Sequence, residues 1–168
     1  MNTLTLVLGG ARSGKSRYAE ALLTRLPAPW HYLATGQAWD EEMRTRVFEH
    51  RSRRGEGWHT VEVPVALGQA LDEAGEHPVL VDCLTLWLSN LLLGEHDLEQ
   101  ASADLMAALQ RRRAPTVLVA SEVGLGIIPD NALARRFRDA AGLLHQRIAE
   151  LADSVVLVVA GLPMPVKG

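Results

Sequence analysis

Short aliphatic runs alternate along the chain with longer segments in which apolar residues recur at every third or fourth position. The runs cover residues 3–8, 30–34, 60–63, 78–83, 116–120 and 155–160. They are apolar almost throughout, which is typical of strands covered on both faces, whereas a strand with one solvated face alternates apolar and polar residues. The pattern therefore predicts the strands of a buried, mostly parallel sheet.

The intervening segments predict helices over residues 13–26, 40–54, 65–74, 84–93, 98–113 and 131–152. The last of these has apolar residues at helical spacing, namely Leu133, Phe137, Leu144, Ile148 and Leu151. Strands that alternate with helices indicate an α/β fold with helices on both faces of the sheet. Ligands of such folds bind at the carboxyl ends of the strands, so candidate chemistry is expected there.

Composition narrows the class of protein. The 168 residues, of which 48% are hydrophobic, predict a single domain over residues 1–168 with a sizeable core. The formal net charge is −3 without a basic stripe, so we expect no nucleic-acid partner. The chain has neither a signal-peptide pattern nor an apolar run of the roughly 20 residues that span a bilayer. Cys83 is the single cysteine, which excludes an internal disulfide and suits a soluble protein of the cytoplasm.

The first strand ends in the sequence Gly9, Gly10, Ala11, Arg12, Ser13, Gly14, Lys15, Ser16, which fits the P-loop pattern G-x-x-x-x-G-K-[ST]. In a P-loop, backbone N–H groups and the start of the next helix bind phosphate oxygens. Lys15 would reach the β and γ phosphates, and the Ser16 hydroxyl would ligate Mg²⁺. A glycine-rich turn that matches by chance is the alternative. The position between a strand and a helix favours the P-loop.

Asp82 ends another apolar run, over residues 78–83. A carboxylate at such a strand end is the usual partner of a P-loop and holds Mg²⁺ directly or through water. The alternative is that Asp82 caps the helix that begins near residue 84. The two roles are compatible, and the P-loop favours the metal role.

His50 lies near the end of the predicted helix over residues 40–54, on one face with Met43 and Val47. The simplest interpretation is a partly buried structural histidine. Three arginines follow it, Arg51, Arg53 and Arg54, and guanidinium groups bind phosphates well. A neutral imidazole nitrogen can also attack phosphorus. The direction of its pKa stays open, because a helix C-terminus favours the cation and neighbouring arginines oppose it.

Five blocks in order resemble one family. They are GGARSGKS, YLATGQAWDEEMRTRVFEHRSRRGEGWHTVEVP, VDCLTLWLSNLL, SEVGLGIIPDNALARRFRDAAGLLHQRIAELAD and VVLVVAGLPMPVKG. The chain resembles the bifunctional adenosylcobinamide kinase / adenosylcobinamide-phosphate guanylyltransferases of cobalamin biosynthesis from Leu4 to near Lys167. A P-loop alone is shared by many families, whereas this ordered set is specific.

The resemblance implies two reactions. ATP or GTP would phosphorylate the aminopropanol hydroxyl of adenosylcobinamide, and GMP would then pass from GTP through a guanylyl-histidine to adenosylcobinamide phosphate. The matching histidine is His50; some members carry a second histidine beside it, where this chain has Glu49. The resemblance also implies a RecA-like P-loop NTPase fold with a mixed sheet, and a homotrimer.

The expected catalytic residues are Lys15, from the P-loop pattern, and His50, from the resemblance. The expected metal ligands, from the P-loop pattern and the strand end, are Ser16 and Asp82. The nucleotide contacts that the resemblance implies are Gly9, Gly10, Ala11, Arg12, Ser13, Gly14, Lys15, Ser16, Ala34, Thr35, Gly36, Arg51, Ser52, Arg53, Arg54, Glu62 and Asp82. Glu122 follows a strand end as well, but its spacing assigns no role.

Two other functions remain compatible with the residues. One is a P-loop kinase for a different small alcohol that catalyses a single reaction and in which His50 is structural. The other is a nucleotide sensor or a nucleic-acid-coupled ATPase, against which the net charge argues.

Overall fold

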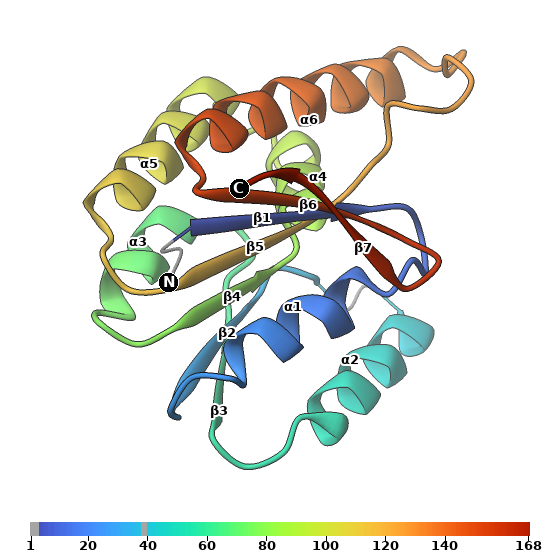
Figure 1. Cartoon of the computed structure of the whole chain (residues 1–168). Helices are drawn as coiled ribbons and strands as arrows, with labels where there is room; N and C mark the ends of the chain where they lie inside the picture. Colours follow the sequence, from blue (N-terminus) through green and yellow to red (C-terminus); the bar gives the residue numbers. More distant parts are fainter. Residues whose placement is uncertain (1–3, 38–39) are drawn as a thin grey trace.

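A computed structural model describes residues 4–37 and 40–168, apart from the side chains of Met43, Arg46, His50 and Arg53. The strands are β1 (Leu4–Gly9), β2 (Trp30–Ala34), β3 (Trp58–Glu62), β4 (Val79–Asp82), β5 (Thr116–Ser121), β6 (Ser154–Val159) and β7 (Leu162–Lys167). The helices are α1 (Lys15–Leu23), α2 (Glu41–Arg53), α3 (Leu67–Glu73), α4 (Leu84–Leu93), α5 (Leu98–Arg111) and α6 (Ala132–Leu151). Figure 1 shows these elements in place.

The strands form one sheet in the order β3-β2-β4-β5-β1-β6-β7. All pairs from β3 to β6 are parallel, and β7 is antiparallel to β6. Gly9 pairs with Ser121 of β5, and Ala34 pairs with Asp82. The carboxyl ends of β1, β2, β4 and β5 therefore meet at one edge of the sheet, where the sequence predicts the chemistry.

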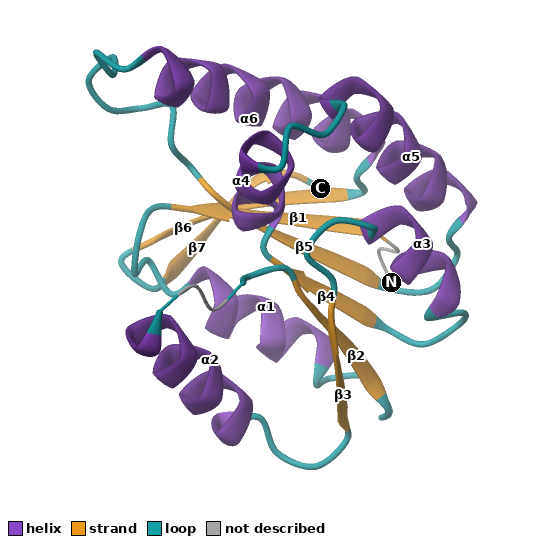
Figure 2. Ribbon diagram, turned by 180° about the vertical axis from the view of Figure 1, so that it is seen from behind, coloured by secondary structure: helices purple, strands orange, loops and turns teal. Residues whose placement is uncertain are grey.

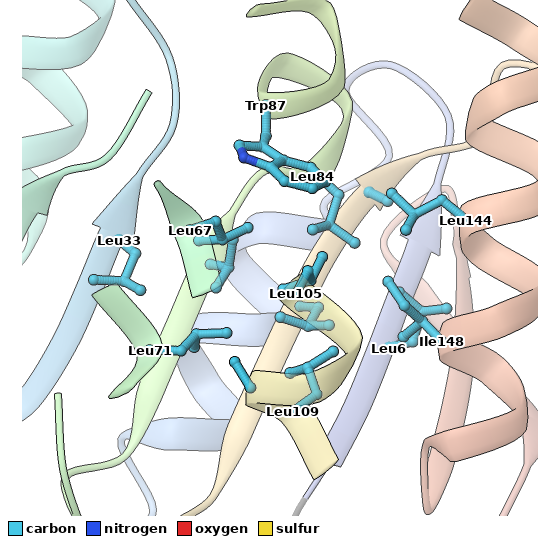
Figure 3. Packing of buried hydrophobic residues seen from close by; sticks show 14 of the residues in the cluster. Leu6, Leu33, Leu67, Leu71, Leu84, Trp87, Leu105, Leu109, Leu144 and Ile148 are labelled. Atoms are coloured by element: carbon cyan, nitrogen blue, oxygen red, sulfur yellow. The ribbon is translucent and has the colours of Figure 1, made fainter. Parts of the chain in front are cut away.

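Helices cover both faces of the sheet, as the apolar strands predict (Figure 2). Successive residues of β1 serve the two sides: Leu6 packs in the cluster under α3 to α6, and Val7 packs in the cluster under α1. Figure 3 shows part of the larger cluster, where Leu105 and Ile148 are fully buried. The predicted α/β fold with a mostly parallel, doubly covered sheet is confirmed, and none of the described helices has the length and hydrophobicity needed to cross a membrane.

The C-terminal strand β7 is the element that the hydrophobic pattern does not predict. Its sequence, LPMPVK, contains Pro163 and Pro165, and all six residues are exposed. Proline lacks an N–H donor, so it is tolerated where a strand pairs on one side only. Among the described strands β7 is the outermost and pairs with β6 alone, and this position explains both the prolines and the exposure.

Helix α1 is shorter than predicted at both ends. It begins at Lys15 instead of residue 13 and ends at Leu23 instead of residue 26. Gly14 has a left-handed backbone with φ of +92°, which a right-handed helix does not accommodate. The loop therefore keeps its last glycine outside the helix, and the helix axis starts directly behind the predicted P-loop.

Candidate active site

The segment between β1 and α1 forms a tight loop. Ser13 N donates to Gly10 O at 3.3 Å, and Tyr18 N donates to Gly14 O at 3.0 Å, which closes the first helical turn. Arg12 and Gly14 both have positive φ, +53° and +92°. The N–H groups at the start of α1 have no side-chain cap, because the N-cap residue, Gly14, has no side chain.

The start of α1 is suited to an anion. Its first turn contains no acidic residue, so the positive end of the helix dipole is not compensated locally. Lys15 Nζ donates to Gly10 O at 3.0 Å and so lies across the loop. Ser13 Oγ is buried and has no hydrogen-bond partner within the described part of the chain. A phosphate group would satisfy these donors together, as in the predicted P-loop.

The turn between β6 and β7 supports this loop from outside. Gly161 N donates to Ser13 O at 2.8 Å. A Cβ on Gly14 would lie 3.3 Å from Gly161 Cα, so the two backbones approach closely. No local sequence pattern predicts this support, because the contact joins segments almost 150 positions apart and depends on the turn after β6.

Asp82 lies at the carboxyl end of β4, and its carboxylate is held by β2. Tyr32 Oη donates to Asp82 Oδ2 at 2.8 Å, and Tyr32 is buried. Burial and the Asp82 charge raise the pKa of Tyr32, so the phenol stays protonated and donates. The N-cap of α4 is Cys83, whose Sγ accepts from Leu86 N at 3.5 Å. The helix-cap alternative for Asp82 is therefore wrong.

The residues near Asp82 fit a magnesium ion better than a metal held by protein alone. The described residues contain no group of three or more His, Cys, Asp or Glu side chains placed to hold a metal. Magnesium typically takes one or two protein carboxylates and completes its shell with phosphates and water. Burial and the Asp82 charge raise the pKa of the Cys83 thiol to about 11. Gly9 pairs with Ser121 and Asp82 pairs with Val119, so the P-loop and the end of β4 both lie at the carboxyl end of β5.

Arg54, the residue after α2, connects that helix to the same site. Its guanidinium carbon lies 3.5 Å from the centre of the Tyr32 ring, a cation–π contact. Arg54 Nε and Nη1 are buried and have no hydrogen-bond partner among the residues the structure describes. Guanidinium N–H groups bind phosphate well, so Arg54 is a candidate phosphate ligand close to the Tyr32–Asp82 pair.

Helix α2 itself is unlike the other helices. Each of its described side chains is exposed, Val47 and Phe48 included, so the predicted partly buried face is not observed for Val47. Arg51 and Ser52 are exposed near its end, while the side chains of His50 and Arg53 lie outside the described part. His50 is the tenth residue of α2, so its backbone lies about 14 Å along the helix axis from that of Glu41.

The other residues predicted from the resemblance lie at the same edge. Ala34 ends β2 and pairs with Glu62, which ends β3. Thr35 is fully buried: its Oγ1 donates to Cys83 O at 2.6 Å, and its carbonyl accepts from Asn90 Nδ2 at 2.7 Å. The Thr35 side chain thus braces the β4–α4 turn, and any nucleotide contact from this stretch would come from its neighbours.

The model of the cobinamide kinase / cobinamide phosphate guanyltransferase family matches residues 5–166. The chain belongs to this family. It is therefore an enzyme with cobinamide kinase and cobinamide phosphate guanyltransferase activity in cobalamin biosynthesis, and nucleoside triphosphates are the substrates that its P-loop fits. The resemblance seen in the sequence is confirmed.

Curated relatives agree with the family. The chain is 48% identical to the bifunctional adenosylcobalamin biosynthesis protein CobP of Pseudomonas aeruginosa, with 97% of this chain and 96% of that protein covered. It is 44% identical to the bifunctional adenosylcobalamin biosynthesis protein CobU of Salmonella typhimurium, with 98% of this chain and 99% of that protein covered. The protein of the same name from Escherichia coli is also 44% identical, with 98% and 99% covered.

Solved structures with little sequence similarity share the fold. An ATPase of the type III secretion system of pathogenic bacteria aligns with a TM-score of 0.59 at 11% identity, covering 97% of this chain. The chain spans 56% of that ATPase. A Pyrococcus horikoshii protein, PH0250, aligns with a TM-score of 0.53 at 8% identity, and the alignment covers 99% of this chain and 86% of that protein. These likenesses support the RecA-like P-loop fold and nothing finer.

Several contacts of this family member were missed from the sequence. Tyr32, Asn90 and Gly161 each support a predicted site residue, but none of them belongs to a recognisable spacing. Glu122, which the sequence left without a role, has a defined place: its backbone N donates to Gly9 O at 2.9 Å. The loop that follows β5 therefore begins beside the P-loop.

Proposed function

We propose that this enzyme phosphorylates adenosylcobinamide with ATP or GTP at the P-loop and then guanylylates the product through His50. The observation that carries the proposal is the pairing of an uncapped P-loop with the Tyr32-held Asp82. The match to both activities of the family along residues 5–166 supports it.

In the kinase step, the acceptor hydroxyl oxygen forms a bond to the γ phosphorus, and the bond to the bridging oxygen breaks. The nucleoside diphosphate leaves, and the hydroxyl proton is released. The N–H groups of Gly9 to Gly14 and the Lys15 ammonium bind the phosphate oxygens and stabilise the developing charge. Ser16 and Asp82 would hold Mg²⁺, which neutralises charge on the β and γ phosphates when bound.

In the guanylyl transfer, a neutral imidazole nitrogen of His50 attacks the α phosphorus of GTP, and pyrophosphate leaves. The phosphate oxygen of cobinamide phosphate then attacks the same phosphorus, which releases His50. Arg51, Ser52, Arg53 and Arg54 follow the nucleophile and would bind the triphosphate. The buried N–H groups of Arg54, which have no partner among the described residues, support this assignment. Ala34, Gly36 and Glu62 would complete the nucleotide site at the adjoining strand ends.

GTP labelled at the α or the γ phosphate tests the covalent step. Label from the α position should stay with the denatured protein, resist alkali and be lost in acid, whereas γ label should not be retained. His50→Asn should abolish the α label and retain most of the kinase turnover, because that step uses the P-loop. His96→Asn, which changes an exposed imidazole, is the matched control and should label normally.

Two results would contradict the assignment. Persistent label in His50→Asn would move the nucleophile to another residue, with His31, His59 and His145 next in order. A wild-type enzyme that phosphorylates cobinamide but never takes up α label would be a single-reaction kinase, the alternative that the sequence left open.

The proposal includes a homotrimer in the cytoplasm. The exposed strand β7 supports self-association, because Leu162, Met164 and Val166 are 69%, 52% and 66% exposed along an unpaired sheet edge. The free, buried Cys83 suits a reducing compartment. Light scattering should give three times the chain mass for the wild type and a smaller mass for Met164→Glu. A monomeric wild type would contradict the trimer.

A further inference from the structure

The loop over residues 122–131 leaves the sheet on the side where β1 enters the P-loop. Ser121 N donates to Thr85 Oγ1 at 2.7 Å, and Glu122 N donates to Gly9 O at 2.9 Å. Its first residues are therefore bound to both the start of α4 and the first glycine of the P-loop. Figures 1 and 2 show the rest of the loop projecting beyond the first turn of α6.

The conformation of this loop is fixed at both ends. Gly124 N donates to Glu122 Oε1 at 2.9 Å. At the other end, Arg135 Nη1 donates to Pro129 O at 2.8 Å and to Asp130 O at 2.7 Å, and Asn131 Oδ1 accepts from Ala134 N at 3.0 Å to cap α6. The loop is thus a built feature that holds its central residues away from the body of the protein.

Those central residues are large and apolar. Leu125 is 84% exposed, Ile127 is 97% exposed and Ile128 is 68% exposed. A side chain that is almost fully exposed contributes nothing to the core, so folding does not account for isoleucine at position 127. Clustered exposed aliphatic side chains are typical of a binding surface.

The kinase reaction requires cobinamide to bind close to the P-loop. The acceptor hydroxyl belongs to a short aminopropanol arm, and this arm must reach the γ phosphate while the flat corrin macrocycle stays outside the sheet edge. Three cavities formed by the described residues lie elsewhere. Two are at the amino ends of the strands, around Thr116, and the third lies between the end of α2 and the start of β3. None of these three faces the P-loop.

We propose that Leu125, Ile127 and Ile128 contact the corrin face of cobinamide and give the kinase its preference for a corrinoid alcohol. The proposal rests on the cobinamide kinase activity of the family. The anchored start of the loop at Gly9 sets the position of these side chains relative to the γ phosphate. The macrocycle presents an apolar face that aliphatic side chains can cover, and its burial would order the acceptor for in-line transfer.

The test compares the double variant Leu125→Ser/Ile127→Ser with Leu143→Ser, which changes a 57% exposed leucine on α6. Equilibrium dialysis with cobinamide, whose colour reports its free concentration, gives Kd directly, and kinase assays give KM and kcat. We expect Kd and KM for cobinamide to rise about tenfold or more in the double variant, since burial of two aliphatic side chains supports at least that change in affinity. KM for the nucleotide should not change, and Leu143→Ser should behave as the wild type.

Unchanged Kd and KM for cobinamide in the double variant would overturn the proposal. A change in molar mass by light scattering, with cobinamide affinity per chain unchanged, would also overturn it and make the loop a contact between subunits. Wild-type protein that binds nucleotide but neither binds nor phosphorylates cobinamide would instead overturn the activity itself, and the loop assignment with it.

Discussion

At the scale of single residues, Lys15 gives the most direct test of the P-loop. Lys15→Ala should lower the kinase kcat by about 100-fold or more, because it removes a positioned cation from the developing charge. Steady-state turnover at saturating Mg²⁺ and nucleotide measures this loss. Arg17→Ala removes an exposed cation from the same helix and is the matched control. Similar turnover in the two variants would exclude Lys15 from the chemistry.

Tyr32 provides a second test at this scale, since its hydroxyl donates to Asp82. Tyr32→Phe removes one hydrogen bond to the carboxylate, and the net value of such a bond, about 0.5–1.5 kcal/mol, corresponds to a rise of about twofold to tenfold in the Mg²⁺ concentration at half-maximal activity. Asp82→Asn should raise this Mg²⁺ concentration further, whereas nucleotide binding without metal should change little. A Mg²⁺ titration of Tyr18→Phe, on α1, should match the wild type.

At the scale of elements, the β6–β7 turn tests whether an edge hairpin supports the P-loop. Gly161 has φ of +79°, so Gly161→Ala should strain the turn by about 1 kcal/mol. Because Gly161 N donates to Ser13 O, nucleotide KM should rise together with the loss of stability. Urea unfolding and kinase assays measure the two effects.

Gly142 is the control for that substitution. It lies exposed within α6, and a Cβ there would meet nothing within 4 Å. Gly142→Ala should therefore increase the free energy of unfolding by about 1 kcal/mol through helix propensity and leave KM unchanged. If Gly161→Ala left nucleotide KM at the wild-type value, the hairpin would be only an edge of the sheet.

At the scale of the whole molecule, two histidines should make stability depend on pH. Burial and the charges of His59, His77 and Arg112 lower the pKa of His31, which stacks on His77 with ring centroids 4.9 Å apart. Burial lowers the pKa of His145, and Glu122 opposes that shift. The folded state thus binds fewer protons than the unfolded state below the usual histidine pKa of about 6.5.

The expected outcome is full stability above about pH 6.5 and a progressive loss as the pH falls below it, through the lowered folded-state pKa values. Urea midpoints measured between pH 8 and pH 5 check this. His31→Gln should flatten the dependence, whereas His96→Gln changes an exposed imidazole and should not. A midpoint that stayed constant down to pH 5 would show that protonation of these histidines costs nothing in the folded state.

Local patterns in the sequence determined much of this protein. Apolar runs predicted β1, β4, β5 and β6, because a strand buried on both faces is apolar almost throughout. The P-loop could be predicted from the sequence because its glycines and its lysine lie within eight consecutive residues. The order of the five family blocks predicted both activities.

Tertiary structure decided the rest, for reasons of distance and exposure. Strand order brought Tyr32 to Asp82 across 50 positions and Gly161 to the P-loop, and no local pattern encodes such pairings. The sequence pattern did not predict β7, because an exposed outer strand tolerates prolines and has no continuous run of buried apolar residues. The sequence alone does not distinguish Leu125 and Ile127 from apolar residues of the core. Only the folded loop showed that they face solvent, because burial depends on what packs against a residue and not on the residue itself.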